Sequence, residues 1–262
     1  MIPKFNVFHK RILLPALVAL SLLFVILFFL PEDYSLYARD SIIIKFWIFI
    51  TITGNPIGVI ISLFITTFIL IFSTRKFLRL HHSLLIFIFI GIGLGAAGYY
   101  LINYLKASFP EPRPYYQFLS ENKSLPEKLE EFTKLTPAQR RLLFSQDSLF
   151  AKPPEGVNPD IYKLWISETA LSFPSGHAFN SAFLGILYTT ILFFTWGKKF
   201  KFLYMAPLVW MILVCLSRVV LGLHHKIDVV FGSLLGLLAA LIFVYIGALN
   251  KIIFMNKENN AS

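Results

Sequence analysis

The chain has little of what metal centres and disulfides are built from. It contains a single cysteine, Cys215, so an intramolecular disulfide is excluded, and no Cys/His cluster has zinc-binding spacing. Charged residues make up only 15% of its 262 residues, and no acidic cluster is available to hold Mg²⁺ or Zn²⁺. We therefore expect Cys215 to be a small core residue, and we expect neither a metal nor another cofactor.

Hydrophobic residues are abundant instead. They form 56% of the chain, 28 of them are phenylalanine, and the mean hydropathy is +0.70. A bilayer span needs about 20 mostly apolar residues, and six runs approach or exceed that length. We predict an all-α integral membrane protein that is one domain over 1–262, with six transmembrane helices at 11–30, 54–74, 83–104, 176–196, 202–221 and 227–249.

Two apolar segments need separate interpretation. The first run follows basic residues, as a signal peptide does, but it is longer than the usual h-region of about 7–15 residues and no small-x-small cleavage site follows. We therefore expect a retained first span. Segment 41–53 is apolar but short and carries Lys45, so it either lies in the membrane interface, which we favour, or extends the second span.

The basic residues predict the orientation in the membrane. Eleven of the 24 lysines and arginines gather at the amino terminus, in two turns and in the carboxy tail, which in a six-span chain all lie on one side. Together with Glu258, these segments account for the formal net charge of +10. The positive-inside rule places them and both termini in the cytoplasm, so no nucleic-acid partner is needed to explain the charge. The basic residues of these four segments are Lys4, Lys10, Arg11, Arg75, Lys76, Arg79, Lys198, Lys199, Lys201, Lys251 and Lys257.

The opposite face then carries one long polar segment, 105–175. Helix-start signals recur in it: one capping box and two capping residues that each directly precede a proline. We predict a small helical periplasmic cap between the third and fourth spans. The signals are Ser124–Glu127, Thr136-Pro137 and Asn158-Pro159.

Three motifs at the non-cytoplasmic ends of the spans carry chemistry. The first, Lys106-x6-Arg113-Pro114, supplies two cations, which alone could merely snorkel to lipid headgroups. The second, Phe173-Pro174-Ser175-Gly176-His177, opens the fourth span, where backbone N–H groups at a helix start favour an anion.

The third motif is Ser217-Arg218-x5-His224-x3-Asp228. Four residues separate His224 from Asp228, so on a helix they share a face, and the carboxylate can fix the imidazole tautomer. His225 has no carboxylate at that spacing and is interpreted as a neighbour. The structural alternative is an interfacial His-Asp pair, but Arg218 in an apolar run is costly without a task.

Together the motifs place cations, donors and two histidines on one face, which is typical of a metal-free phosphate site. At these residues the sequence resembles the type 2 phosphatidic acid phosphatase superfamily, whose pattern is K-x6-R-P, P-S-G-H and S-R-x5-H-x3-D. The resemblance covers about 100–235. Every defined position matches: Lys106, Arg113, Pro114, Pro174, Ser175, Gly176, His177, Ser217, Arg218, His224 and Asp228.

The resemblance implies a role for each residue. His224 would attack phosphorus and form a phosphohistidine, Asp228 would orient it, and His177 would protonate the leaving oxygen. The phosphoryl group would be held by Lys106, Arg113, Ser175, Gly176 and Arg218.

The long insert between the first two motifs resembles the bacterial phosphatidylglycerophosphatase B group. That resemblance implies a multi-pass protein of the bacterial inner membrane with its active site facing the periplasm. Its partner would be a lipid substrate, with no obligate protein partner evident. Undecaprenyl diphosphate would be hydrolysed to the monophosphate, with phosphatidylglycerophosphate or phosphatidate as other substrates.

Three alternatives remain open. The same residues could serve a lipid A phosphatase or phosphotransferase. A different class is an ion- or proton-coupled transporter that uses Arg218, His224 and Asp228 as a relay, although their place at span ends and the lack of an inverted repeat disfavour it. The third is a catalytically silent lipid-binding relative.

Overall fold

The computed structural model of the protein describes residues 8–31, 42–73, 80–121, 129–146, 153–196 and 202–246. Within these ranges all regular structure is helical. The elements are η1 (His9–Leu13), α2 (Leu14–Phe29), α3 (Ile42–Thr53), α4 (Pro56–Ser73), α5 (Leu80–Gly93), η3 (Leu94–Leu101), α6 (Ile102–Ser108), α7 (Pro114–Glu121), α8 (Leu129–Lys134), α9 (Pro137–Gln146), α10 (Pro159–Ser167), α11 (Gly176–Trp196), η5 (Leu203–Met205), α12 (Ala206–Val220) and α13 (Lys226–Tyr245).

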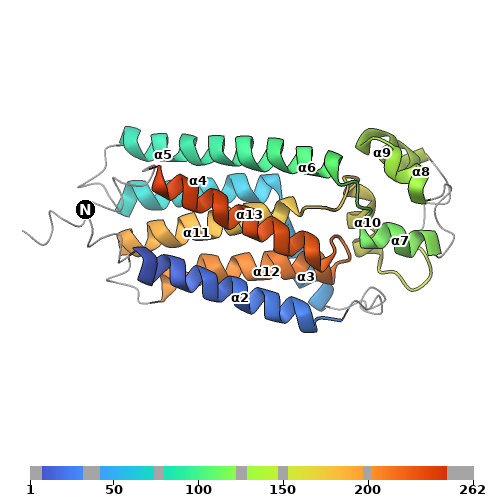
Figure 1. Ribbon diagram of the computed structural model, residues 1–262, viewed down its shortest axis with the longest axis horizontal. Helices are drawn as coiled ribbons and strands as arrows, with labels where there is room; N and C mark the ends of the chain where they lie inside the picture. Colours follow the sequence, from blue (N-terminus) through green and yellow to red (C-terminus); the bar gives the residue numbers. More distant parts are fainter. Residues whose placement is uncertain are drawn as a thin grey trace, which may run out of the picture.

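The long helices form a bundle of membrane-spanning length (Figure 1). By length and composition five helices in the described ranges could each cross a bilayer, and a sixth span arises if α3 and α4, bent by 67°, are counted as one. The predicted all-helical membrane protein is thereby confirmed, with five to six candidate spans. The five are His9–Phe29, Leu84–Ser108, Gly176–Thr195, Leu203–Val220 and Lys226–Tyr245.

The third span is longer than the sequence suggested. Helical structure runs on through η3 and α6 to Ser108, whereas the hydropathy run was expected to end at 104. Lys106 therefore lies in the last turn of this span instead of following it. Its ammonium is thus carried on a helix, at a fixed place beside the neighbouring loop.

Helix α11 is the centre of the bundle, and 78% of its most apolar stretch is buried inside the protein. It lies against α13 at very short range, because a Cβ on Gly232 would lie 2.4 Å from the Ser175 carbonyl oxygen. A Cβ on Gly236 would lie equally close to the Phe179 carbonyl oxygen. Glycine is thus required at this helix contact, which holds the starts of α11 and α13 together.

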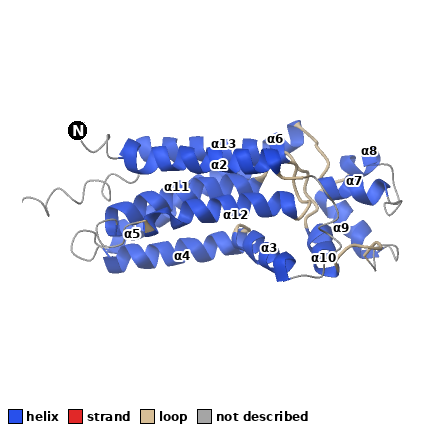
Figure 2. Ribbon diagram, turned by 90° about the horizontal axis from the view of Figure 1, so that it is seen from below, coloured by secondary structure: helices blue, strands red, loops and turns tan. Residues whose placement is uncertain are grey.

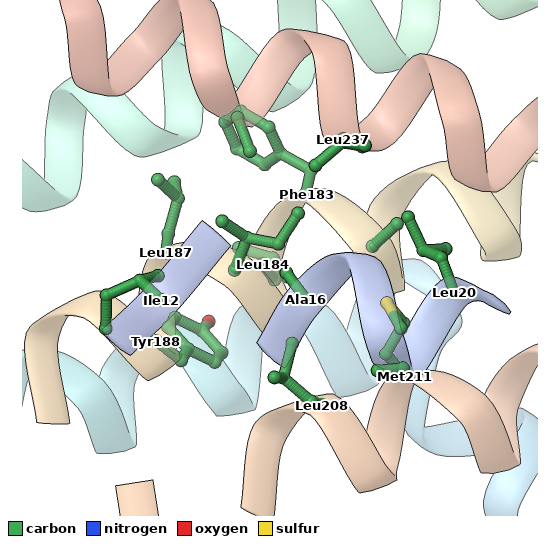
Figure 3. Close-up of a cluster of buried hydrophobic side chains, with 14 of the residues drawn as sticks. Ile12, Ala16, Leu20, Phe183, Leu184, Leu187, Tyr188, Leu208, Met211 and Leu237 are labelled. Atoms are coloured by element: carbon green, nitrogen blue, oxygen red, sulfur yellow. The ribbon is translucent and has the colours of Figure 1, made fainter. Parts of the chain in front are cut away.

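The other face of α11 packs on α2 and α12 (Figure 3). Burial of these large aliphatic and aromatic side chains fixes the helix positions through close packing. Buried side chains labelled in the figure include Ile12, Ala16, Leu20, Phe183, Leu184, Leu187, Tyr188, Leu208, Met211 and Leu237.

Helices α7 to α10 gather at one end of the bundle and form the helical cap (Figures 1 and 2). Trp165 is fully buried there, stacks on Tyr115 at 5.3 Å between ring centroids, and donates its indole N–H to the Leu221 carbonyl at 2.7 Å. The helical cap is therefore anchored to the turn between α12 and α13.

Two of the predicted helix-capping residues, Thr136 and Asn158, are confirmed. The Thr136 hydroxyl accepts a hydrogen bond from Gln139 N, and the Asn158 side chain accepts one from Asp160 N. Ser124–Glu127 lies outside the described residues.

The tripeptide Gly54-Asn55-Pro56 breaks the chain between α3 and α4. The Asn55 side chain accepts a hydrogen bond from Gly58 N at 2.8 Å and so caps α4. A Cβ on Gly54 would lie 2.6 Å from Val214 Cγ1, so glycine allows the bend to approach α12. Of segment 41–53, expected as interfacial or as an extension of the second span, residues 42–53 form the helix α3, which packs beside α12.

Candidate active site

The three motifs converge where the bundle meets the helical cap. Lys106 comes from α6, Arg113 directly precedes α7, and Ser175 to His177 begin α11. Arg218 lies in the last turn of α12 and Asp228 in the first turn of α13. Residues more than 100 positions apart in the chain thus share one site.

His224 and Asp228 are in contact, as the spacing predicted, but His224 lies in the turn before α13. His224 Nδ1 is 3.4 Å from Asp228 Oδ2, and both side chains are buried. Gly222 makes this turn possible, since its φ of 67° is strained for any residue with a Cβ. Asp228 Oδ2 also accepts the His225 N–H at 2.8 Å. The carboxylate is therefore held beside one ring nitrogen of His224.

Burial lowers the pKa of His224 well below its ordinary value, and the nearby cations Arg113, Arg218 and Lys106 lower it further. The imidazole is therefore neutral at neutral pH. A neutral imidazole whose Nδ1–H faces a carboxylate has its lone pair on Nε2, which is the form that a nucleophile requires.

A carboxylate occupies the space between the two arginines. Glu168, at the end of α10, contacts Arg113 Nη2 through Oε2 at 3.1 Å and Arg218 Nη2 through Oε1 at 3.0 Å. Both arginines are almost completely buried. A carboxylate that bridges two guanidinium groups presents a negatively charged oxygen to each of them, as a bound phosphate would.

The pKa of Glu168 reflects this position. Burial alone would raise it, but Arg218 and Arg113 outweigh burial and hold the pKa well below its usual range. Glu168 is therefore ionised at neutral pH. An incoming phosphate that used both arginines would have to displace this carboxylate.

The arginines make further contacts that fix their planes. Arg113 donates through Nε to the Ala170 carbonyl at 2.6 Å and through Nη1 to the Leu223 carbonyl at 3.2 Å. Arg218 donates through Nη1 to Thr51 Oγ1 at 2.6 Å, while its Nε finds no partner in the described part of the chain. That buried N–H is available to an anion.

Lys106 donates to two loop carbonyls, those of Leu171 at 2.5 Å and Ser172 at 2.9 Å. Its ammonium thus holds the loop that leads into α11. Across the described ranges no three His, Cys, Asp or Glu side chains gather as potential metal ligands.

The start of α11 supplies Ser175, Gly176 and His177. Ser175 is buried, accepts the Ala178 N–H at 3.4 Å as a helix cap, and donates its own N–H to the Asp228 carbonyl at 3.0 Å. Among the described residues, a Cβ on Gly176 would meet only Ile102, at an ordinary 3.7 Å. Packing within the protein therefore leaves room at Gly176.

Sequence reasoning assigned no role to Glu168, Thr51 or Ser172. Ser172 Oγ lies 2.5 Å from Asp228 Oδ2 and 3.3 Å from His224 Nδ1. Each of the three contacts a motif residue at least 50 positions away. No local pattern marks such contacts.

An apolar pocket of about 490 Å³ adjoins the site between α6 and α13. Its volume falls within the range of about 300–1,000 Å³ for small-molecule sites. Half-exposed Phe109, Ile227 and Phe231 line its outer part, and buried Asp228 also borders it. The pocket therefore joins the bundle surface to the polar site.

Comparison with known proteins relates the chain to bacterial phosphatases. Phosphatidylglycerophosphatase B of Haemophilus influenzae is 32% identical over 166 residues, which are 58% of this chain and 61% of that protein. The protein of the same name from Escherichia coli K12 is 27% identical over 190 residues, 72% of this chain and 70% of the relative. That of Bacillus subtilis is 38% identical over 107 residues, 37% of this chain and 51% of the relative.

The chain thus spans less than two thirds of the length of the Haemophilus and Bacillus relatives. The pattern of the PAP2 superfamily matches residues 84–252, which hold all three motifs and most of the bundle. Because this match covers more than half of the sequence, the chain belongs to the PAP2 superfamily.

Proposed function

We propose that this protein is a membrane lipid phosphatase that forms a phosphohistidine on His224. The observation that carries the proposal is the convergence of Arg113 and Arg218 with the His224–Asp228 pair beside an apolar pocket. The arginines offer fixed positive charge, the neutral imidazole offers a nucleophile, and the pocket suits a hydrocarbon chain.

In the proposed first step, the phosphate displaces Glu168 from the arginines. His224 Nε2 attacks phosphorus as the bond to the leaving oxygen breaks, and His177 gives its proton to that oxygen. The positive charge on His224 is stabilised by Asp228 through Nδ1–H.

In the second step, water attacks the phosphohistidine, and neutral His177 accepts a proton from the water. The N–P bond breaks, inorganic phosphate leaves, and His224 returns to its neutral form. Lys106, Arg113, Arg218, Ser175 and the Gly176 backbone are proposed to hold the phosphoryl oxygens in both steps.

The lipid class is proposed from two sources. The names of the relatives point to phosphatidylglycerophosphate, whereas undecaprenyl diphosphate stays the prediction from the resemblance. In both lipids the terminal phosphate belongs to a head group that is attached to long hydrocarbon chains, so the same pocket would serve either. With the diphosphate, the leaving group is the lipid monophosphate.

The deciding experiment measures phosphate release from a lipid panel in detergent with EDTA, for wild type and His224→Ala. The panel holds phosphatidylglycerophosphate, undecaprenyl diphosphate, phosphatidate and lipid A. We expect EDTA-resistant release that His224→Ala abolishes. Release by the variant at the wild-type rate would refute the nucleophile, and labelled phosphate arriving on lipid A would indicate a phosphotransferase.

The role of the pocket has its own test. Leu235→Trp would occupy part of the pocket, so we expect kcat/KM to fall about tenfold or more for a long-chain lipid, since each loss of about 1.4 kcal/mol in binding of the chain is a tenfold change. Hydrolysis of a short soluble phosphate ester should stay unchanged. Leu234→Trp, one residue away and outside the pocket lining, is the matched control. Equal effects of Leu235→Trp on both substrates would argue against a chain-binding pocket.

We also propose the orientation, with both termini in the cytoplasm of a bacterial cell and the site facing the periplasm. Lys10 and Arg11 begin the bundle at the end away from the helical cap, which supports this arrangement (Figure 1). The other basic segments lie outside the described residues. Reporter fusions at the carboxy terminus that are active only in the periplasm would contradict it.

A further inference from the structure

Ser172 lies outside the three motifs but is held at the centre of the site. Its side chain is fully buried, its N–H donates to the Glu111 carbonyl at 2.8 Å, and its carbonyl accepts from Lys106 Nζ at 2.9 Å. Two backbone hydrogen bonds therefore fix the residue before any substrate binds. From this fixed backbone the hydroxyl points toward the site.

That direction is the gap between Asp228 and His224. Ser172 Oγ donates to Asp228 Oδ2 at 2.5 Å and lies 3.3 Å from His224 Nδ1, while the direct distance between Nδ1 and Oδ2 is 3.4 Å. A hydroxyl has one proton to donate and lone pairs to accept with. While the Ser172 hydroxyl donates its proton in a hydrogen bond to the carboxylate, its oxygen can accept the Nδ1–H of His224.

The carboxylate depends on few anchors. Asp228 Oδ2 takes the Ser172 hydroxyl and the His225 N–H, whereas Oδ1 is buried and accepts nothing from the described part of the chain. Without the hydroxyl, the His225 N–H would be the one short hydrogen bond to the carboxylate among these contacts. The link from the carboxylate to His224 would then rest on the 3.4 Å contact.

We propose that Ser172 is a positioning residue that bridges Asp228 and His224. The bridge keeps the proton on Nδ1 and directs the Nε2 lone pair toward the phosphorus. This inference rests on the proposed function of His224 as nucleophile. Ser172 itself touches no reacting atom, so it acts on the rate through the orientation of His224.

The first test compares Ser172→Ala with wild type on the preferred lipid of the panel. A lost hydrogen bond to a charged group should lower kcat about 10- to 100-fold, while KM stays within about twofold, because the phosphate contacts are untouched. Ser233→Ala is the control, a buried serine whose hydroxyl, among the described residues, donates to the Val230 carbonyl of its own helix. An unchanged kcat, or a rise in KM alone, would overturn the bridge.

A double-mutant cycle with Asp228→Asn separates positioning from general damage. If Ser172 acts through Asp228, adding Ser172→Ala to Asp228→Asn should cost no more than about twofold, since coupled residues are not additive. A double variant whose loss of kcat equals the product of the two single losses would refute the bridge. Should Ser172→Ala fail to fold, Ser172→Cys keeps the size with a weaker donor and should lower kcat in the same direction.

A measurement without substrate keeps the bridge separate from the proposed function. Ring ¹⁵N resonances of His224, identified by their loss in His224→Ala, report the tautomer of the resting protein. We expect Nδ1–H in wild type and a mixture of tautomers in Ser172→Ala. Identical spectra would overturn the bridge even if lipid hydrolysis is found, whereas a wild type that hydrolyses no lipid would overturn only the phosphatase proposal.

Discussion

Replacing Glu168 with glutamine tests whether its carboxylate competes with phosphate for the arginines. Glu168 contacts Arg113 at 3.1 Å and Arg218 at 3.0 Å, one carboxylate oxygen on each. Glutamine has the same shape but only one acceptor oxygen and no charge. The variant should therefore hold one arginine less well and leave the pair more open to an anion.

The magnitude follows from the number of bonds lost. A hydrogen bond to a charged group contributes about 1.5–3 kcal/mol, and glutamine can keep one of the two. An anion that binds to the variant therefore has one charged hydrogen bond fewer to break, so it should bind about 10- to 100-fold more tightly than to wild type. Without an anion the variant should be less stable, by less than the roughly 3–5 kcal/mol for breaking a fully buried pair, because the Glu168 side chain is 22% exposed.

Orthovanadate is a suitable probe, because it resembles phosphate in size and charge and can be titrated by inhibition and by thermal unfolding. We expect Glu168→Gln to unfold at lower temperature than wild type and to gain more stability from vanadate. Asp160→Asn removes an exposed carboxylate from the same helix, α10, and should behave as wild type. A folded Glu168→Gln protein that binds vanadate no more tightly than wild type would refute the competition.

Two further predictions concern pH and packing. Because the pKa values of His224 and Glu168 are lowered by folding, the unfolded chain takes up protons first, near about 6.5 and 4.3. The free energy of unfolding should fall as the pH drops below about 6.5, through His224, and fall further below about 4.3, through Glu168. Because His224 stays neutral in the folded protein, its protonation should not lower kcat/KM as the pH passes about 6.5. A stability that rises on acidification would contradict these shifts. Gly232→Ala would place a Cβ 2.4 Å from the Ser175 carbonyl oxygen, so the free energy of unfolding should fall by about 1–3 kcal/mol. Most of the activity should be lost with it. Gly91→Ala, with nothing within 4 Å, should cost neither, and equal unfolding temperatures of the two variants would show that the close helix contact is unimportant.

Much of the fold could be read from the sequence because bilayer spans are encoded locally. A run of about 20 apolar residues is sufficient to indicate a helix of spanning length, and the helices at 9–29, 176–195, 203–220 and 226–245 follow the predicted runs. The third span departs from its run because helix propagation continues through Lys106 after hydropathy falls. Likewise, Thr136 and Asn158 were identifiable as caps because capping involves residues only two or three positions apart.

The sequence by itself determined which residues carry the PAP2 motifs and that His224 and Asp228 would touch, since four positions separate them. Only the tertiary structure decided what fills the space between Arg113 and Arg218, and what lies between His224 and Asp228. Glu168 and Ser172 reach their partners from 50 and 56 positions away along the chain. The physical reason is that a local sequence pattern reports helix periodicity and capping only. Whether distant buried charges meet depends on how closely α11, α12 and α13 pack. Glycines such as Gly232 set that distance through contacts with another helix.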